Sequence, residues 1–357
     1  MATGYTRNET TDRTVRTLWT AVMAAGNMAT TVFPGAPCGL TCRKDEKSTA
    51  TSPKVAEPKE TQALRDALFD FEPFEVRLNG KQRVPMVFNS PHSGRHYPPE
   101  FLAQSRLDTA KIRRSEDFCV DELFAHAHVI GAPMLVAHFP RAYLDVNREP
   151  YELDPKMFEG ALPSFANISS PRVAGGLGTV PRLVAENMEI YHRRLPVAEA
   201  LRRIEGIYRP YHECLLKLVA RTHSAFGRAV LIDCHSMPAS VRSTATAMRP
   251  DFIIGDRFGT SAAHELSRTA ALILQEMGYV VTRNKPYAGG FITEHYGRPA
   301  QGLHALQIEV NRGLYFDEER LVKKSGFSRL QRDLAEFIDD LAAFIEADMA
   351  PRAQAAE

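Results

Sequence analysis

The sequence predicts an α/β fold in which helices flank a central, mixed but mostly parallel sheet, because three features agree. Short apolar runs of strand character alternate with amphipathic helical stretches. Several of these runs end in polar or charged residues, as strands do where a parallel sheet forms a ligand crevice. An apolar content of 44% and a charged content of 24% are those of a globular chain with a large core.

The 357 residues divide into two parts of different composition. Thr, Ala, Ser, Lys and Pro dominate residues 1–65 without sustained hydrophobic periodicity, so we expect a disordered leader or extension there. The mildly apolar segment 18–26 offers a weak targeting signal as the alternative, and it is too short to span a membrane. Residues 66–350 show no internal repeat and no linker, which predicts a single domain.

Charge and cysteine usage narrow the class of partner. A formal net charge of +1 gives no electrostatic reason to bind nucleic acid or an acidic membrane surface, so we expect a small-molecule partner. The cysteines form no CxxC pair, which disfavours a cysteine zinc site, and we expect reduced thiols in a cytosolic protein. The five cysteines are Cys38, Cys42, Cys119, Cys214 and Cys234.

The expected domain begins with two strands, at residues 74–78 and 84–89. The dipeptide Asn79-Gly80 between them predicts a hairpin turn. Asp108 is a candidate N-cap for a helix that runs to about residue 128. The first part of the domain therefore reads as two paired strands followed by one long helix.

The middle of the chain alternates between the two kinds of pattern. Residues 133–139 and 142–146 have strand character. Residues 151–180 are rich in Pro, Gly and Ser and predict a long loop of the kind that often covers an active site. Helical patterns follow at residues 182–194 and 197–226.

The last third of the chain continues the alternation that defines the fold class. We expect strands at residues 229–232, 251–255, 279–283 and 303–310, and helices at residues 261–277 and 317–347. Because strands and helices follow one another at short intervals, crossover connections and a mostly parallel sheet are the natural arrangement.

Four apolar runs end in groups that can bind a metal, move a proton or hold a carboxylate, and this is the main functional signal of the chain. Residues beyond the carboxyl ends of parallel strands line one crevice, so we expect these four ends to converge on one pocket. The segments are LIDCHSMP at 231–238, VFNSPHSGRH at 87–96, AYLDVNR at 142–148 and LQIEVNR at 306–312.

Two histidines and one acid form a common catalytic zinc set, with the fourth position left open for water. His92 and His235 are the candidate histidines, and His96 could replace either. A packed core histidine is the alternative interpretation of His235. The acid is Asp117 or Asp121. Asp117 falls at the edge of the apolar stripe of its expected helix, where a carboxylate needs a cation or an arginine partner nearby.

Other polar ends supply a base and carboxylate-binding groups. Glu309 ends a buried strand and is the candidate general base and proton shuttle. Arg148 and Arg312, with Arg141 as a third, can each bind a carboxylate through two parallel hydrogen bonds. The serines beside the candidate histidines lie in neither a GxSxG nor an SxxK motif, which disfavours a serine hydrolase.

Seven longer motifs resemble those of the N-formylglutamate amidohydrolase family and occur in the same order, from about residue 84 to residue 319. They are SPHSGRHYP, SEDFCVDELF, YLDVNREPYELDP, LIDCHSMP, DFIIGDRFGTSA, NKPYAGGFITEHYGRP and LQIEVNRGLYFDE. Residues 1–70 have no counterpart in the family. The resemblance implies a three-layer, phosphorylase/hydrolase-like fold similar to that of the zinc carboxypeptidases, with one Zn²⁺ per chain.

The resemblance also implies the metal ligands. His92 resembles the first zinc ligand of the superfamily and His235 the last. The acid of the carboxypeptidase-type HxxE spacing is absent, because Arg95 occupies its place. The middle ligand is therefore Asp117 as first choice and Asp121 as second.

The implied reaction is the hydrolysis of N-formyl-L-glutamate to formate and L-glutamate, the last step of one histidine-degradation route. Asn147 and Arg148 of LDVNR resemble the pair that holds the substrate carboxylate, and Glu309 of QIEVNR resembles the general base. Two alternatives remain: a zinc amidohydrolase of another small acidic N-acyl compound, and a binding protein that kept the pocket but lost the metal.

Overall fold

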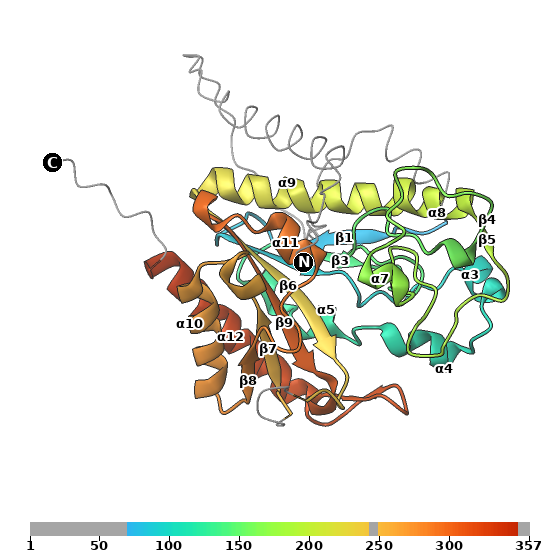
Figure 1. Cartoon of the computed structure of the whole chain (residues 1–357). Helices are drawn as coiled ribbons and strands as arrows, with labels where there is room; N and C mark the ends of the chain where they lie inside the picture. Colours follow the sequence, from blue (N-terminus) through green and yellow to red (C-terminus); the bar gives the residue numbers. More distant parts are fainter. Residues whose placement is uncertain (1–69, 243–248, 349–357) are drawn as a thin grey trace, which may run out of the picture. The chain divides into compact units, whose positions relative to one another are not determined.

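The computed structural model describes residues 70–242 and 249–348, in which a seven-stranded mixed sheet carries helices on both faces (Figure 1). The strand order is β1-β3-β2-β6-β9-β7-β8. The four strands β3, β2, β6 and β9 are parallel, whereas β1 at one edge and β7 with β8 at the other run in the opposite direction. The predicted α/β class with a mixed, mostly parallel sheet is confirmed.

The strands are short at the edges of the sheet and long at its centre. They are β1 (Phe74–Arg77), β2 (Met86–Ser90), β3 (Met134–Ala137), β6 (Ala229–Met237), β7 (Phe252–Gly255), β8 (Val281–Arg283) and β9 (Leu303–Asn311). Two small sheets pair β4 (Phe158–Glu159) with β5 (Leu195–Pro196) and β10 (Phe316–Asp317) with β11 (Val322–Lys323). The long central pair, β6 and β9, is buried along its whole length.

The helices vary from single turns to one of 22 residues. The α-helices are α3 (Pro99–Gln104), α4 (Thr109–Ile112), α5 (Val120–Leu123), α6 (His126–Val129), α7 (Pro171–Ala174), α8 (Val197–Arg203), α9 (Arg209–Phe226), α10 (His264–Glu276), α11 (Phe291–Tyr296) and α12 (Phe327–Asp348). The short 3-10 helices are η1 (Arg113–Ser115), η2 (Pro155–Met157), η4 (Arg257–Gly259), η5 (Pro299–Gln301) and η6 (Arg312–Leu314), and η3 (Ile204–Tyr208) is a π-helix between α8 and α9.

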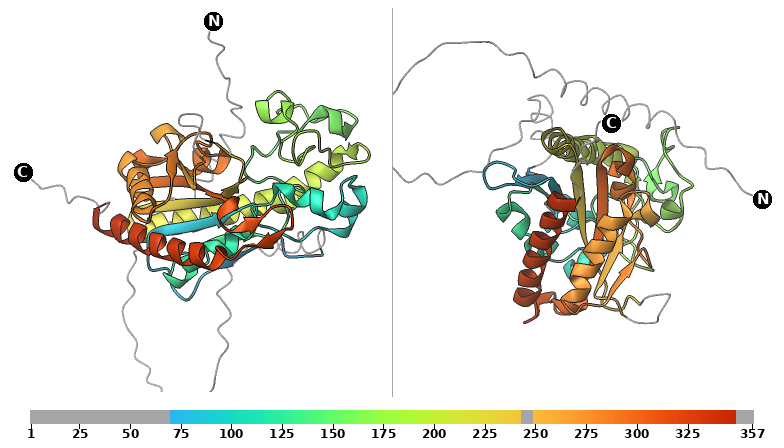
Figure 2. Two further views of the ribbon diagram at one scale, coloured as in Figure 1. Left: turned by 90° about the horizontal axis from the view of Figure 1, so that it is seen from below. Right: turned by 90° about the vertical axis from the view of Figure 1, so that its left-hand side faces the viewer.

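The alternation of side chains along the central strands separates a hydrophobic face from a functional one. Even-numbered residues of β2, β3, β6, β7 and β9 belong to one hydrophobic core together with α5, α10 and α12. The right-hand view of Figure 2 shows α10 and α12 side by side. Odd-numbered residues, which include Asp233, His235 and Glu309, point to the opposite face, where α9 and α11 pack.

Several expected elements differ from those observed. The hairpin of the first two strands is wrong, because β3 lies between β1 and β2 in the sheet. Residues 142–146 and 182–194 form irregular structure and turns rather than a strand and a helix. The last helix begins at Phe327 instead of residue 317, since β10 and β11 occupy the start of that segment.

The long helix expected after Asp108 is divided into pieces, and the reason is tertiary. Asp108 does cap a helix, because its side chain accepts a hydrogen bond from the backbone N–H of Lys111. That helix, α4, ends after one turn, and residues 116–119 are not helical. The backbone N–H of Asp117 instead donates to the carbonyl of His92, and Cys119 has a φ of 55°. A contact with the loop after β2 thus replaces the continuing helix.

Some expectations concern residues that the structure does not describe. The leader or extension at residues 1–65 lies outside the described residues, as do Cys38 and Cys42. Cys119, Cys214 and Cys234 are buried and form no disulfide among the described residues. Within residues 70–242 and 249–348, no helix is both long and apolar enough to cross a membrane.

Candidate active site

Three buried side chains from distant parts of the chain meet near the carboxyl ends of the central strands. They are His92, Asp117 and His235, and their potential metal-binding atoms lie within 4.8 Å of one another. Asp117 Oδ2 is 2.9 Å from His235 Nδ1 and 3.5 Å from His92 Nδ1. Two imidazole nitrogens and one carboxylate oxygen therefore face the same small region, which suits a metal site of two histidines and an acid.

Each of the three side chains is positioned by a different local structure. His92 lies in the loop after β2, and His235 lies inside β6, which extends five residues further than expected, to Met237. Because β2 and β6 are parallel neighbours, their carboxyl ends lie together. Asp117 lies in the break between η1 and α5 rather than on a helix, and its backbone bond to His92 holds it beside the histidine.

A carboxylate holds the second nitrogen of each histidine. His92 Nε2 is 2.8 Å from Asp145 Oδ1, and His235 Nε2 is 2.8 Å from Asp233 Oδ2. An ionised carboxylate can only accept a hydrogen bond, so each Nε2 carries a proton and donates it. This arrangement leaves each Nδ1 directed at Asp117, and it is the usual way in which metal-binding histidines are oriented.

One buried nitrogen of the cluster lacks a hydrogen-bond partner, and a cation could bind it. His92 Nδ1 is buried and has no hydrogen-bond partner among the described residues. Buried polar atoms are rarely left unpaired in proteins. A divalent cation between the two Nδ1 atoms and Asp117 Oδ2 would satisfy this nitrogen, and two imidazoles with one carboxylate are ligands that zinc accepts. The residues present therefore fit the expected metal.

The charges of the cluster are strongly coupled. Burial alone raises the pKa of Asp117, but the hydrogen bond from His235 and the charge of its ring outweigh it and hold the pKa well below its ordinary value. Burial lowers the pKa of His235, but the carboxylates of Asp233 and Asp117 outweigh it and raise the pKa well above the ordinary value. A cation at this point would take the place of the His235 Nδ1 proton, so metal binding releases a proton.

Glu309 lies next to the cluster on the neighbouring strand. It is the register partner of His235 across the parallel pair of β6 and β9, and it is 8% exposed. Gln307 Nε2 donates a hydrogen bond to Glu309 Oε1 over 2.8 Å. Burial raises the pKa of Glu309 to about 7, although the positive charge of His235 opposes the shift. A carboxyl group with this pKa can both accept and release a proton near neutral pH.

The three candidate arginines differ in how exposed their side chains are. Arg312 Nη2 donates to Asp117 Oδ1 over 3.2 Å, and its side chain is 5% exposed. Arg148 is also nearly buried; it donates to two backbone carbonyls, and burial lowers its pKa to about 10. Arg141 Nε donates to Asp145 Oδ2 over 3.0 Å, and 29% of its side chain is exposed. Arg141 is therefore the most accessible of the three.

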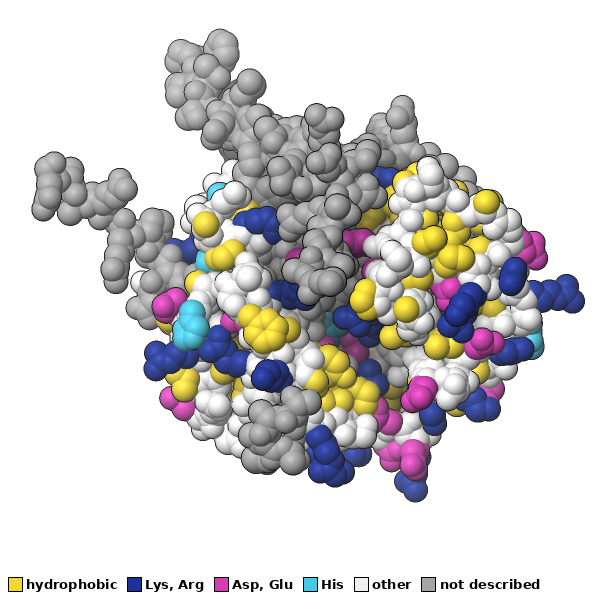
Figure 3. Space-filling model, in the orientation of Figure 1, with side chains coloured by type: hydrophobic (Ala, Val, Ile, Leu, Met, Phe, Trp, Pro, Cys, Tyr) yellow, Lys and Arg dark blue, Asp and Glu magenta, His cyan; other side chains and the backbone are white. Residues whose placement is uncertain are grey.

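Asn147 is held tightly at the edge of the cluster. Its Oδ1 accepts the backbone N–H of Ile292 at the start of α11 over 2.8 Å, and its Nδ2 is 3.2 Å from His235 Nε2. Gly290 lies so close that a Cβ there would meet the Asn147 side chain at 2.5 Å. Asn147 thus connects the cluster to the start of α11. Figure 3 shows a recess near the centre of the view in which basic and acidic side chains are visible.

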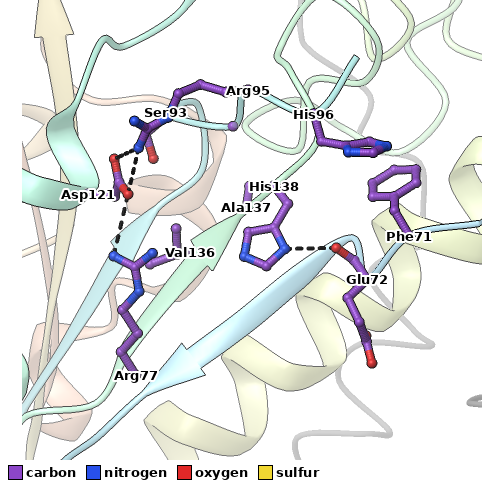
Figure 4. Close-up of a pocket in the computed structure, with 11 residues that line it drawn as sticks. Phe71, Glu72, Arg77, Ser93, Arg95, His96, Asp121, Val136, Ala137 and His138 are labelled. Atoms are coloured by element: carbon purple, nitrogen blue, oxygen red, sulfur yellow. Dashed lines mark hydrogen bonds and ion pairs between the residues drawn. The ribbon is translucent and has the colours of Figure 1, made fainter. Parts of the chain in front are cut away.

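The second-choice acid, Asp121, is not part of the cluster. It is 4% exposed and forms ion pairs with Arg95 at 2.7 Å and with Arg77 at 3.4 Å. Figure 4 shows both arginines directed at Asp121 on the wall of a cavity of about 370 Å³. His96 lines the same cavity, where it stacks on Phe71 with 4.2 Å between ring centroids. Neither residue is brought near His235.

Sequence reasoning missed the residues that orient the cluster. Asp145 and Asp233 were visible in LDVNR and LIDCHSMP, but no role was expected for them. Gln307 lies two residues before Glu309 on the same face of β9, a spacing that could have revealed it. For Asp233 and Gln307 the signal is a polar residue two positions before His235 or Glu309 in a buried strand, because such a residue must find a partner. Asp145 lies outside the strands, and its role depends on the tertiary contact with His92.

Comparison with known proteins adds independent information. A family model described as N-formylglutamate amidohydrolase matches residues 84–316. A Pseudomonas aeruginosa protein named N-formylglutamate deformylase is 30% identical over 248 residues, which are 69% of this chain and 87% of the relative. A Pseudomonas putida protein of the same name is 28% identical over 239 residues, which are 66% of this chain and 83% of the relative.

Solved structures agree with the sequence matches. The crystal structure of N-formylglutamate amidohydrolase from Ralstonia eutropha JMP134 superposes with a TM-score of 0.72 at 35% identity. The match covers 77% of this chain and 98% of that one. The Agrobacterium tumefaciens gene product Atu2144 gives a TM-score of 0.53 at 18% identity and covers 79% and 98% of the two chains. This second likeness supports the fold alone.

Proposed function

Because the chain belongs to the N-formylglutamate amidohydrolase family and is therefore a hydrolase of amide bonds, we propose that it converts N-formyl-L-glutamate to formate and L-glutamate. We propose that one Zn²⁺ is held by His92, Asp117 and His235. The observation that carries the proposal is that these three side chains are buried close together and that Glu309 lies beside His235 on the neighbouring strand. The names of the two Pseudomonas relatives support the choice of substrate.

The proposed chemistry assigns proton transfer to Glu309. A zinc ion in this position would supply the positive charge that polarises the formyl oxygen and makes water more acidic. Glu309 takes a proton from the attacking water, whose oxygen forms a bond to the formyl carbon. The carbon–nitrogen bond then breaks as Glu309 gives that proton to the departing amine. Its pKa of about 7 suits both steps.

Substrate binding is proposed for the positive and amide groups around the cluster. Asn147, Arg148, Arg312 and Arg141 remain the candidates for the two carboxylates of the substrate. We expect Arg141 to make the most direct contact, because its side chain is the most exposed of the three. Arg312 and Arg148 would then act mainly by holding Asp117 and Asp145 in place.

One experiment tests the reaction and its metal together. Metal content and N-formylglutamate hydrolysis are measured on one sample, before and after chelation and after zinc is restored. About one zinc per chain, with activity lost and regained, supports the proposal. Turnover that survives complete metal removal contradicts it.

The substrate itself is tested by a screen of formyl-, acetyl- and succinyl-derivatives of glutamate and aspartate. We expect the formyl group and glutamate to be preferred. Zinc binding together with preference for another acyl group would keep the proposed metal site and replace the proposed substrate. Zinc binding without hydrolysis of any of them would favour a binding protein.

A further inference from the structure

A chain of buried hydrogen bonds connects helix α9 to one of the proposed metal ligands. Tyr211 on α9 donates its hydroxyl proton to Asn89 Oδ1, and Asn89 Nδ2 donates to Asp233 Oδ1 over 2.8 Å. The other oxygen of Asp233 accepts from His235 Nε2 over 2.8 Å. We propose that Asn89 and Tyr211 are positioning residues for His235, acting through Asp233, and this inference rests on the metal site proposed above.

The direction of every bond in this chain is determined. The carboxylate of Asp233 can only accept, so the NH₂ group of Asn89 must face it. The carbonyl oxygen of Asn89 is then left to accept the Tyr211 hydroxyl proton. Each oxygen of Asp233 has a separate donor, which prevents the carboxylate from rotating. The ring of His235 is thereby held with Nδ1 toward Asp117.

The members of the chain lie on rigid and fully buried elements. Asn89 on β2 is the direct register partner of Asp233 on β6, and both are 0% exposed. Tyr211 is also 0% exposed, and the helix that carries it, α9, packs against both strands. Positions fixed by neighbouring strands and a packed helix vary little, which is what a metal ligand requires of its support.

A role in stability alone does not explain why these hydrogen-bonded polar side chains are buried here. Burying an amide and a carboxylate between two strands carries a desolvation penalty, and apolar side chains of similar size would fill the space without it. The series of hydrogen bonds ends at His235, which lies beside Asp117 and His92, so its effect is to orient the His235 ring.

The carboxylates that bind the two proposed histidine ligands, His92 and His235, have different hydrogen-bond donors. The partner of His92, Asp145, contacts the guanidinium groups of Arg141 and Arg148. The partner of His235, Asp233, is contacted by the neutral amides of Asn89 and Asn147. A neutral donor leaves the negative charge of Asp233 uncompensated, so His235 receives the stronger electrostatic support as a ligand. Loss of Asn89 should weaken metal binding for another reason, because Asp233 then loses the donor that fixes its orientation and, with it, the orientation of the His235 ring.

The test measures zinc affinity by competition with a chromophoric chelator, together with the thermal stability of the metal-free protein. Asn89→Leu removes both hydrogen bonds at similar volume, and Tyr211→Phe removes only the hydroxyl. Tyr296→Phe is the matched control, because it removes another buried phenol hydroxyl at the interface of α9 and α11, and this hydroxyl bonds His212 rather than Asn89 or Asp233.

We expect the dissociation constant for zinc to rise roughly tenfold or more in Asn89→Leu, the range seen when such outer partners are lost. Tyr211→Phe should give a smaller rise of a few-fold, and Tyr296→Phe should stay within about twofold of wild type. If Asn89→Leu does not fold, the comparison of Tyr211→Phe with Tyr296→Phe decides the question.

The outcomes separate this inference from the proposed function. Wild-type protein that binds zinc, with both variants binding it equally well, would overturn the positioning role and leave the metal site standing. The same holds if the variants only lose thermal stability while zinc affinity is unchanged. Wild-type protein that binds no zinc would overturn the proposed metal site, and the positioning role with it.

Discussion

Asp117 and Asp121 show how two acids four residues apart acquire different roles from their surroundings. Both are almost fully buried, so each requires positive charge nearby. Asp121 obtains it from Arg95 and Arg77, which complete its ion pairs without any metal. Asp117 obtains it from the histidines and from Arg312. Burial alone would not have separated the two, whereas the identity of the partners does.

The first prediction concerns this pair. Asp117→Asn should reduce the zinc content from about one per chain to near zero, because the amide is a poor ligand and lacks the charge of the carboxylate. Asp121→Asn is the matched control and should keep its zinc while losing about 1 to 2 kcal/mol of stability, since two arginines lose a charged acceptor. Metal analysis and thermal unfolding measure both. Loss of zinc in Asp121→Asn alone would reverse the assignment.

The second prediction concerns Glu309. Glu309→Gln preserves shape and the contact with Gln307 but removes the group that takes the proton. Turnover should fall roughly 100-fold or more, the usual contribution of a general base, while zinc content stays near one per chain. The exposed Glu336 on α12 serves as control for the same substitution. Near-normal turnover of Glu309→Gln would remove the proposed role.

At the scale of elements, local patterns predicted most of the helices and strands but not their interruptions. The pattern from Asp108 to residue 128 is helical in character, yet the chain leaves the helix where Asp117 binds the backbone of His92. The strand expected to stop before Asp233 continues to Met237, because β9 pairs with it over nine residues. In both cases a partner distant in sequence overrides the local preference.

The third prediction tests how closely the loop of His92 packs. Gly94 lies in this loop, and a Cβ there would be 2.0 Å from the backbone oxygen of Phe139. Gly94→Ala should therefore destabilise the protein by about 2 kcal/mol or more and weaken zinc binding, because the loop must move. Gly175→Ala is the control: its Cβ would lie 3.4 Å from the nearest atom, so stability should be unchanged or slightly higher. Equal effects of the two substitutions in thermal unfolding would contradict the prediction.

The fourth prediction concerns the contact between α9 and the loop before Asn147. His212 Nε2 donates to the carbonyl of Val146 over 2.8 Å, and burial lowers the pKa of His212 to about 3. An unfolded chain binds this proton at about pH 6.5. Between pH 6.5 and pH 3 the unfolded state thus binds a proton that the folded state does not, so stability falls as the pH falls through this window.

His212→Gln should reduce this acid sensitivity, because glutamine can donate to the same carbonyl but does not titrate. The difference between wild type and variant should amount to a few kcal/mol at most across the window, as roughly 1.4 kcal/mol accompanies each pKa unit. His192→Gln at an exposed position is the control. Parallel stability curves for wild type and His212→Gln in chemical denaturation from pH 7 to pH 4 would refute the argument.

At the scale of the whole molecule, the match to known proteins and the described fold cover nearly the same residues. The family model spans residues 84–316, and the sheet runs from Phe74 to Asn311. We propose that residues 66–350 form the catalytic domain. The fifth prediction is that a variant lacking residues 1–65 keeps its zinc, turnover and melting temperature. Loss of folding in that variant would show that the first 65 residues belong to the domain.

The sequence by itself determined the fold class and the candidate residues for the proposed chemistry, because both depend on local information. Apolar periodicity predicts strands and helices, and polar groups at the ends of apolar runs indicated His92, His235 and Glu309. The family followed from ordered motifs, and comparison confirmed it. These signals can be read without knowing which strands pair.

Only the tertiary structure decided how those residues meet. The strand order, the choice of Asp117 over Asp121 in the cluster, the nitrogen that each histidine presents and the accessibility of Arg141 all depend on contacts between distant segments. The physical reason is that a buried polar group takes its role from its partners. Those partners, such as Asp233 for His235, are fixed by packing and hydrogen bonding rather than by neighbours in sequence.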